Sequence, residues 1–173
     1  MARLNDGSPH HHRVPENLIG AIRDRGVGDL TVVSATLGTG ERGLGLLFQT
    51  GQISRVVAAY AGENDLFEKQ FHDGQIELEL VPMGTLAERM RCAGAGIPAF
   101  FTRTGAGTLV HHGGMPQRYS ADGARSLVQV SLPRESRRFA SPGGGESEYV
   151  MEEALFGDFA LVDTYLHLAT RSP

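Results

Sequence analysis

Two adjacent stretches decide the fold, Ala59-Tyr-Ala-Gly-Glu-Asn-Asp-Leu-Phe-Glu-Lys-Gln70 and Gly84-Thr-Leu-Ala-Glu-Arg-Met-Arg-Cys-Ala-Gly-Ala-Gly-Ile-Pro-Ala-Phe-Phe-Thr-Arg-Thr-Gly-Ala-Gly107. Each combines a strand, a glycine-rich turn and a helix, an arrangement that can present backbone N–H groups to a ligand. Units of this kind recur along the chain, so they predict the architecture as well as a candidate site.

Strand and helix patterns alternate four times at regular spacing, which is typical of βαβ units. We therefore predict an α/β fold, an open and mostly parallel sheet with flanking helices. The expected parallel strands lie near 30–34, 53–60, 76–81 and 98–102. The expected helices lie near 16–25, 65–72 and 85–92, with a shorter one over 43–50 that Gly45 weakens.

The helix starts carry recognisable capping residues. Asn64 or Asp65 can cap the helix over 65–72, and Asp65 with Glu68 has the spacing of a capping box. Thr85 and Glu88 have the same spacing, so we expect a second capping box at the start of the next helix.

The alternation ends near residue 110, and residues 110–150 read as an irregular β insert. A hairpin turn is expected at Asp122-Gly123, between Arg118–Tyr119 and Leu127–Val130. Glu148–Met151 and Phe159–Val162 are expected to be two more strands. We divide the chain into a disordered tail over 1–13, which contains His10-His-His12, one domain over 14–163 and a tail over 164–173.

Composition excludes several classes of function. The chain has 173 residues, which suits one domain, and its net charge of −4 gives no electrostatic reason to bind nucleic acid. No apolar run is long enough for a membrane span. The one cysteine, Cys92, excludes an internal disulfide framework, and we read it as a buried small side chain.

The candidate site lies in the glycine-rich turns, where ligands of open α/β sheets bind. The ordinary alternative is that Gly62 and Asn64 serve a turn and a helix cap, and that Gly94 and Gly96 end a helix. Small residues at 94–96 would also let another chain of an oligomer approach the backbone. The candidate residues are Gly62, Glu63, Asn64, Gly94, Ala95, Gly96, Thr104 and Gly105. No metal-ligand, Walker or Ser-His-Asp pattern is present, so we expect no metal site.

From Pro15 to Val162 the chain resembles the α half of family I CoA-transferases, particularly the mitochondrial succinyl-CoA:3-ketoacid type. The matching words are Pro15-Glu-Asn-Leu-Ile19, Asp29-Leu-Thr-Val-Val-Ser34, Gly43-Leu-Gly-Leu-Leu47, Tyr60-Ala-Gly-Glu-Asn64, Phe67-Glu68, Gly84-Thr-Leu-Ala-Glu-Arg89, Gly94-Ala-Gly-Ile-Pro-Ala-Phe100 and Gly157-Asp-Phe-Ala-Leu-Val162. The stretch Gly113-Gly-Met-Pro-Gln-Arg-Tyr119 through Pro133-Arg-Glu135 is similar to an insert of the mitochondrial members.

The resemblance implies transfer of CoA between succinyl-CoA and a 3-oxoacid such as acetoacetate, the chemistry of ketone-body catabolism. It implies a CoA thioester as substrate, no separate cofactor, and a β half as partner. The family's glutamate nucleophile lies in that β half, in a Ser-Glu-Asn-Gly context. Glu63 stands in the α-half context Ala-Gly-Glu-Asn instead, so we assign no catalytic residue to this chain and expect it to be inactive alone. The implied location is the mitochondrial matrix, or the cytoplasm if the N-terminus is complete as given.

The chain departs from the family at places that matter for a substrate site. The family has an Asn-Asn pair where Ala35 and Thr36 stand, and a substrate-facing glutamine where Met83 stands. Met83 is therefore a candidate pocket residue whose thioether would weaken the site, unless it packs into the core. Both ends also depart from the pattern, so we expect an α-type domain truncated at both ends.

Two other functions compete with the CoA-transferase α half. One is a non-catalytic relic or interaction domain of the same fold, which the substitutions at 35, 36 and 83 favour. The other is a general nucleotide- or phosphate-binding α/β module, whose phosphate loop would have to be one of the glycine turns. Hetero- or homo-oligomers are compatible with the first two.

Overall fold

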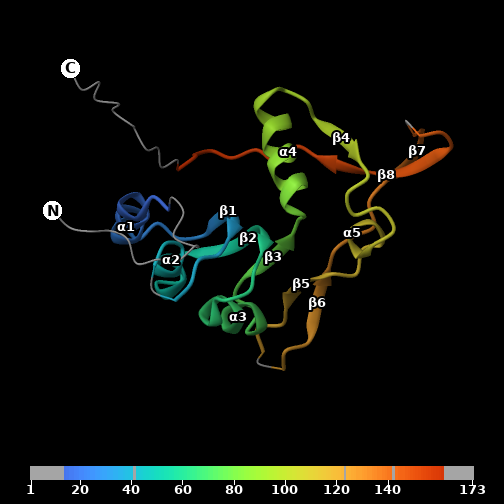
Figure 1. The fold of residues 1–173 in the computed structure, drawn as a ribbon. Helices are drawn as coiled ribbons and strands as arrows, with labels where there is room; N and C mark the ends of the chain where they lie inside the picture. Colours follow the sequence, from blue (N-terminus) through green and yellow to red (C-terminus); the bar gives the residue numbers. More distant parts are fainter. Residues whose placement is uncertain (1–13, 41, 123, 142, 162–173) are drawn as a thin grey trace, which may run out of the picture.

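The structure is a computed structural model that describes residues 14–161, except 41, 123 and 142 (Figure 1). The tails predicted over 1–13 and 164–173 lie outside these residues. In the described part, no helix is both long enough and apolar enough to cross a membrane.

A parallel three-stranded sheet forms the centre of the first part of the chain. Its strands are β1 (Leu30–Thr36), β2 (Ile53–Tyr60) and β3 (Glu77–Leu80), in the order β1-β2-β3. Val56 in the middle strand pairs with Val32 on one side and with Leu78 on the other. The α/β class and the parallel sheet predicted from the sequence are confirmed for these strands.

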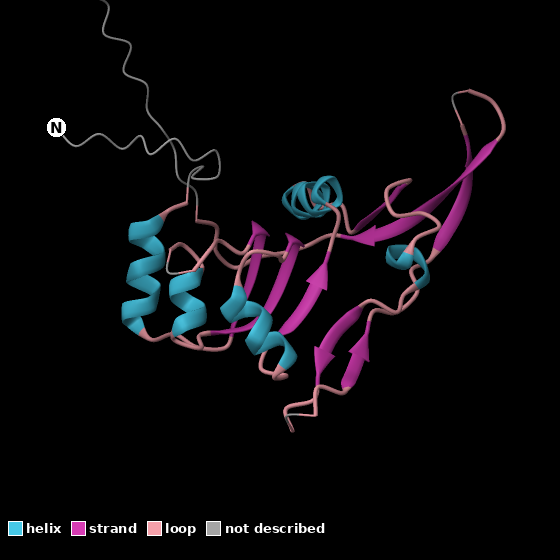
Figure 2. Ribbon diagram, turned by 60° about the horizontal axis from the view of Figure 1, so that its bottom comes forward, coloured by secondary structure: helices cyan, strands magenta, loops and turns pink. Residues whose placement is uncertain are grey.

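Three helices cover one face of this sheet (Figures 1 and 2). They are α1 (Glu16–Arg25), α2 (Gly45–Gln49) and α3 (Asp65–His72). Their apolar side chains meet the inward residues of β2 in one core, where Phe48 and Phe67 pack edge to face at 5.6 Å between ring centroids. Each such fully buried side chain contributes about 1.5–3 kcal/mol.

Gly45, which weakens the pattern of α2 in the sequence, is required by packing. A Cβ at this position would collide with the backbone carbonyl of Gly40, which cannot move aside cheaply. The glycine therefore trades helix propensity for a close approach between α2 and the preceding loop.

The opposite face of the sheet is covered by α4 (Met83–Gly94), whose Leu86 packs against Val57 and Val81 (Figure 2). The helix begins two residues before the predicted start, so the capping box expected at Thr85 is wrong: Thr85 lies inside the first turn. At the other end the N–H of Gly96 donates to the carbonyl of Ala93 and that of Ile97 to Cys92. With Gly96 at φ 71°, this is a Schellman motif.

The fourth predicted parallel strand is wrong in its partner. Strand β4 (Ala99–Thr102) pairs antiparallel with β8 (Glu146–Glu153), which also pairs with β7 (Ser136–Ala140). The free edge of β3 is instead approached by β5 (Pro116–Tyr119). A four-residue apolar strand has no feature that selects its partner, and β8 offers a longer ladder than the short β3.

The insert has the hairpin that its turn residues predict. Strands β5 and β6 (Leu127–Val130) pair antiparallel, and α5 (Leu109–His112) precedes them. Tyr119 anchors this hairpin on α3 by packing edge to face against Phe71, 5.1 Å between centroids. The strand predicted at 148–151 is confirmed within β8. The one at 159–162 is wrong for residues 159–161, which are not in a strand, and Val162 lies outside the described residues.

Candidate functional site

The carboxyl ends of the three parallel strands meet at one edge of the sheet, the edge at which open α/β sheets bind ligands. Leu37 follows β1, the turn Gly62–Asn64 follows β2, and Met83 follows β3 after a short connection. Because β2 is the middle strand, the predicted turn 62–64 lies at the centre of this edge.

Asn64 fixes the central turn. Its side chain is 2% exposed, and its Oδ1 accepts a hydrogen bond from the N–H of Phe67 at 2.9 Å, which caps α3. Its Nδ2 donates to the carbonyl of Leu37 at 3.2 Å, so one amide joins the loops that follow β1 and β2. The expected cap is confirmed for Asn64, and the second bond gives this residue a role that a cap alone does not explain.

Glu63 adopts a backbone conformation that a side chain rarely takes. Its φ is 68°, in the left-handed region, and the residue is exposed. Such a conformation costs of the order of 1 kcal/mol and persists where neighbours enforce it, here the anchored Asn64. The Glu63 side chain is therefore open to solvent, and no described contact links it to a base or an acid.

The first turn of α4 contributes unpaired backbone donors to the same edge. The residue before the helix is Pro82, and no side chain caps this end. The first N–H groups of a helix carry a partial positive charge, which favours anions and polarised carbonyl oxygens. Gly84, within this turn, has open space where a Cβ would stand. This end of α4 can therefore receive a carboxylate or a thioester carbonyl.

The residues that depart from the family pattern lie at this same edge. Ala35 and Thr36 end β1 and are exposed, and Met83 is 53% exposed at the start of α4. The alternative that Met83 packs into the core is therefore wrong. None of these three side chains offers the amide donor and acceptor groups of asparagine or glutamine.

The other predicted site residues do not share this edge. Gly94, Ala95 and Gly96 lie at the far end of α4, about 18 Å from its start at 1.5 Å per residue. Thr104 and Gly105 follow β4 in the antiparallel sheet, where a Cβ on Gly105 would lie 2.8 Å from Val110. The expectation that all the turns meet at one sheet edge is thus wrong for residues 94–96, 104 and 105. Their contact with a ligand stays a prediction.

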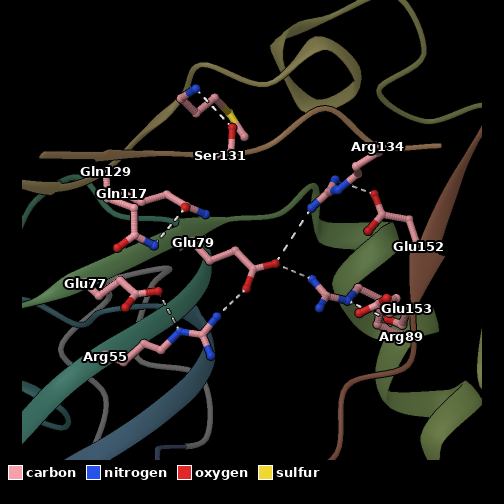
Figure 3. Close-up of polar contacts among 11 residues, drawn as sticks. Arg55, Glu77, Glu79, Arg89, Gln117, Gln129, Ser131, Arg134, Glu152 and Glu153 are labelled. Carbon is pink, nitrogen blue, oxygen red and sulfur yellow. Dashed lines mark hydrogen bonds and ion pairs between the residues drawn. The ribbon is translucent and has the colours of Figure 1, made fainter. Parts of the chain in front are cut away.

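A network of arginines and glutamates, which the sequence patterns did not single out, joins the two sheets (Figure 3). Glu79 on β3 is its centre. Its carboxylate accepts from Arg55 at 2.9 Å and from Arg89 of α4 at 2.6 Å, and Arg134 lies 3.7 Å away. The Nε of Arg89 also donates to the carbonyl of Glu153 at 2.8 Å. In the sequence, the alternating glutamates of β3 indicate only a wetter strand face, and their arginine partners are distant along the chain.

Arg134 connects this network to the antiparallel sheet. It lies 2.5 Å from the carboxylate of Glu152, a side chain that is 1% exposed. Burial raises the pKa of Glu152, while the charges of Arg134 and Arg89 oppose that rise. These groups line a cavity of about 330 Å³, but their charges are satisfied by one another, so the network has the character of a structural clamp. Among the described residues, no group of three or more His, Cys, Asp or Glu is arranged to hold a metal ion.

Comparison with known proteins identifies the family. Residues 10–166 match the family model described as coenzyme A transferase, and the chain belongs to this family. It is 50% identical over 149 residues to a mouse succinyl-CoA:3-ketoacid coenzyme A transferase named as mitochondrial, covering 86% of this chain and 27% of the relative. It is 47% identical over 152 residues to a Mycobacterium bovis protein named as one probable subunit of the same enzyme, covering 88% and 58%.

A solved structure shares the fold. The crystal structure of an acyl-CoA transferase apoenzyme from Escherichia coli O157:H7 matches with a TM-score of 0.58 and 22% identity, covering 81% of this chain and 26% of that one. The chain thus spans about a quarter of the length of the mammalian relatives. What it matches is the region that the bacterial relatives carry as a separate subunit.

Proposed function

We propose that this chain is the α half of a CoA-transferase that moves CoA between succinyl-CoA and a 3-oxoacid such as acetoacetate. One observation carries the proposal: identity of 45–50% along 149–152 residues to proteins named for that reaction, in both mammals and bacteria. The reaction exchanges one thioester for another, with no change in oxidation state. It therefore needs a nucleophile and an oriented substrate, and we propose no cofactor beyond the CoA thioester itself.

In this proposal the chain supplies the substrate edge and a β half supplies the attacking carboxylate. The turn Gly62–Asn64 and the uncapped start of α4 lie at the edge where a carboxylate substrate or thioester carbonyl can accept backbone hydrogen bonds. Thr104 and Gly105 would contribute through another surface. The bacterial relatives are each named as one subunit of the enzyme, which supports a separate partner of this kind. A mitochondrial location is a proposal that rests on the mammalian relatives, and cell fractionation tests it.

The second candidate is a relic or interaction domain of the same fold. The observation that favours it is the position of Ala35, Thr36 and Met83, which are exposed at the very edge where the substrate would be oriented. A site built to hydrogen-bond a substrate loses about 1–3 kcal/mol for each bond removed, and several losses at one edge would suppress turnover.

Reconstitution separates the two candidates. The purified chain is mixed with the subunit that completes the Bacillus subtilis relative, and formation of acetoacetyl-CoA from succinyl-CoA and acetoacetate is followed. The CoA-transferase proposal predicts turnover that requires both chains and saturates as the partner is added. A stable complex without turnover would favour the relic.

A further inference from the structure

The outer face of α4 is an apolar surface without a partner in the described structure. Met83 is 53% exposed and Met90 is 46% exposed, and Ala87 and Gly94 are exposed or partly exposed as well. These positions are separated by 4, 3 and 4 residues, so they form one stripe along the helix. The opposite face, with Thr85, Leu86, Arg89 and Cys92, is buried against the sheets. We call residues 83, 87, 90 and 94 the α4 stripe.

The α4 stripe carries no net charge of its own. Its charged neighbours, Glu88 and Arg91, bond to each other at 2.7 and 2.9 Å, which lowers the pKa of Glu88 and raises that of Arg91. Two methionines with a satisfied ion pair at the border resemble the apolar centre and polar rim of a protein interface. Nothing here would attract a nucleic acid or an anionic membrane.

The α4 stripe is continuous with two other features of the chain. At one end, Met83 reaches the carboxyl edge of the parallel sheet, next to the uncapped first turn of α4. At the other end, Gly94 leads into the exposed turn of Ala95, Gly96 and Ile97, where small residues allow close approach of another backbone. A molecule lying along the stripe would therefore reach the substrate edge directly.

We infer that the α4 stripe is the surface on which the β half docks, an inference that rests on the proposed function. A β half that delivers a carboxylate to the substrate edge must contact the chain beside that edge, and the α4 stripe is the apolar surface that begins there. A second copy of this chain is a less suitable occupant, because it brings no such carboxylate. The stripe is about 18 Å long at 1.5 Å per residue, so it would be the centre of a larger contact of roughly 800 Å² on each side.

The described chain offers a competing apolar surface that serves as a matched control. Val128 and Val130 of β6 are 60% and 40% exposed, and Leu132 beyond them is 80% exposed. They lie in the insert, away from the carboxyl edge. If apolar exposure alone selected the partner, this surface would be covered instead of the α4 stripe.

Cysteine protection tests the inference. Cys92 is 1% exposed, so Met90→Cys and Val128→Cys each add one accessible thiol, and the unaltered chain reports any reaction of Cys92. Each variant is treated with a maleimide, alone and with the Bacillus subtilis partner, and complex formation is measured separately by light scattering. We expect a complex in which the thiol at position 90 reacts at least about tenfold more slowly, while that at 128 is unchanged.

The outcomes separate the inference from the proposal beneath it. A complex that leaves position 90 as reactive as in the free chain, or that protects 128 instead, overturns the docking surface while the proposed function stands. Failure to form any complex contradicts the proposed partner, and the inference falls with it. A Met90→Asp variant, expected to weaken the complex without unfolding the exposed position, gives an independent reading of the same surface.

Discussion

The side-chain amide of Asn64 donates to the backbone carbonyl of Leu37 at 3.2 Å, and this bond ties together the loops that follow β1 and β2. The same side chain caps α3 through the N–H of Phe67. One buried residue therefore sets both the start of a helix and the shape of the candidate substrate edge.

The two bonds of Asn64 can be separated by substitution. Asn64→Ser keeps a capping oxygen but cannot reach Leu37, whereas Asn64→Ala loses both bonds. We expect Ala to lower the free energy of unfolding by about 1 kcal/mol more than Ser, the usual contribution of a cap. Urea denaturation measures the difference, with the exposed neighbour Asp65→Ala as control, expected within about 0.5 kcal/mol of the unaltered chain. Equal stability of the Ser and Ala variants would contradict the capping role.

The pair Arg134 and Glu152 is expected to act as one unit. Arg134→Met leaves a carboxylate that is 1% exposed without its partner, which costs about 3–5 kcal/mol. The double variant Arg134→Met/Glu152→Leu removes both charges and should recover most of that loss. A thermodynamic cycle over the four proteins measures the coupling, and simple additivity of the two single variants would show that the clamp does not exist.

Stability should depend on pH through Glu152. Because burial raises the pKa of this carboxyl above its ordinary value of 4.5, the folded state binds the proton more tightly than the unfolded state. Its contribution to stability is therefore fully present below pH 4.5 and is lost as pH rises through the folded pKa. Glu152→Gln does not titrate and still accepts from Arg134, so we expect its melting temperature relative to the unaltered chain to be highest above that pKa.

The control for this pH dependence is Glu146→Gln, whose side chain is 62% exposed beside Arg138. Scanning calorimetry at several pH values should show a difference that changes with pH for position 152 and stays nearly constant for position 146. A constant difference at 152 would mean that its burial does not affect its titration.

Met83→Gln is expected to raise activity in the reconstituted system. The amide restores a donor and an acceptor at the substrate edge, worth about 1–3 kcal/mol or roughly 5- to 150-fold. The position is 53% exposed, so the swap should not disturb the core, and Met83→Leu controls for shape. The rate is measured at saturating partner, because Met83 also lies in the α4 stripe. If the unaltered chain already matches the Gln variant, Met83 does not impair the site.

The sequence predicts the parallel strands and their helices well, because apolar periodicity and capping residues are local. Asn64 is recognisable as a cap, but its bond to Leu37 joins residues 27 positions apart and has no sequence signal. The antiparallel pairing of Ala99–Thr102 with β8 escapes prediction for the same reason: a short apolar strand does not encode its partner. The clamp around Glu79 escapes it because its arginines come from three separate parts of the chain, and only a structure shows that they converge.

The central claim is that this chain holds a substrate edge and depends on another half for the attacking carboxylate. The most direct test is the rate of acetoacetyl-CoA formation from succinyl-CoA and acetoacetate. It is measured for the purified chain alone, for the chain mixed with its partner, and for Glu63→Gln under both conditions. Removal of a covalent nucleophile costs several orders of magnitude in rate. The account predicts no turnover by the chain alone and turnover with the partner that survives Glu63→Gln. Turnover by the chain alone that Glu63→Gln abolishes would contradict it.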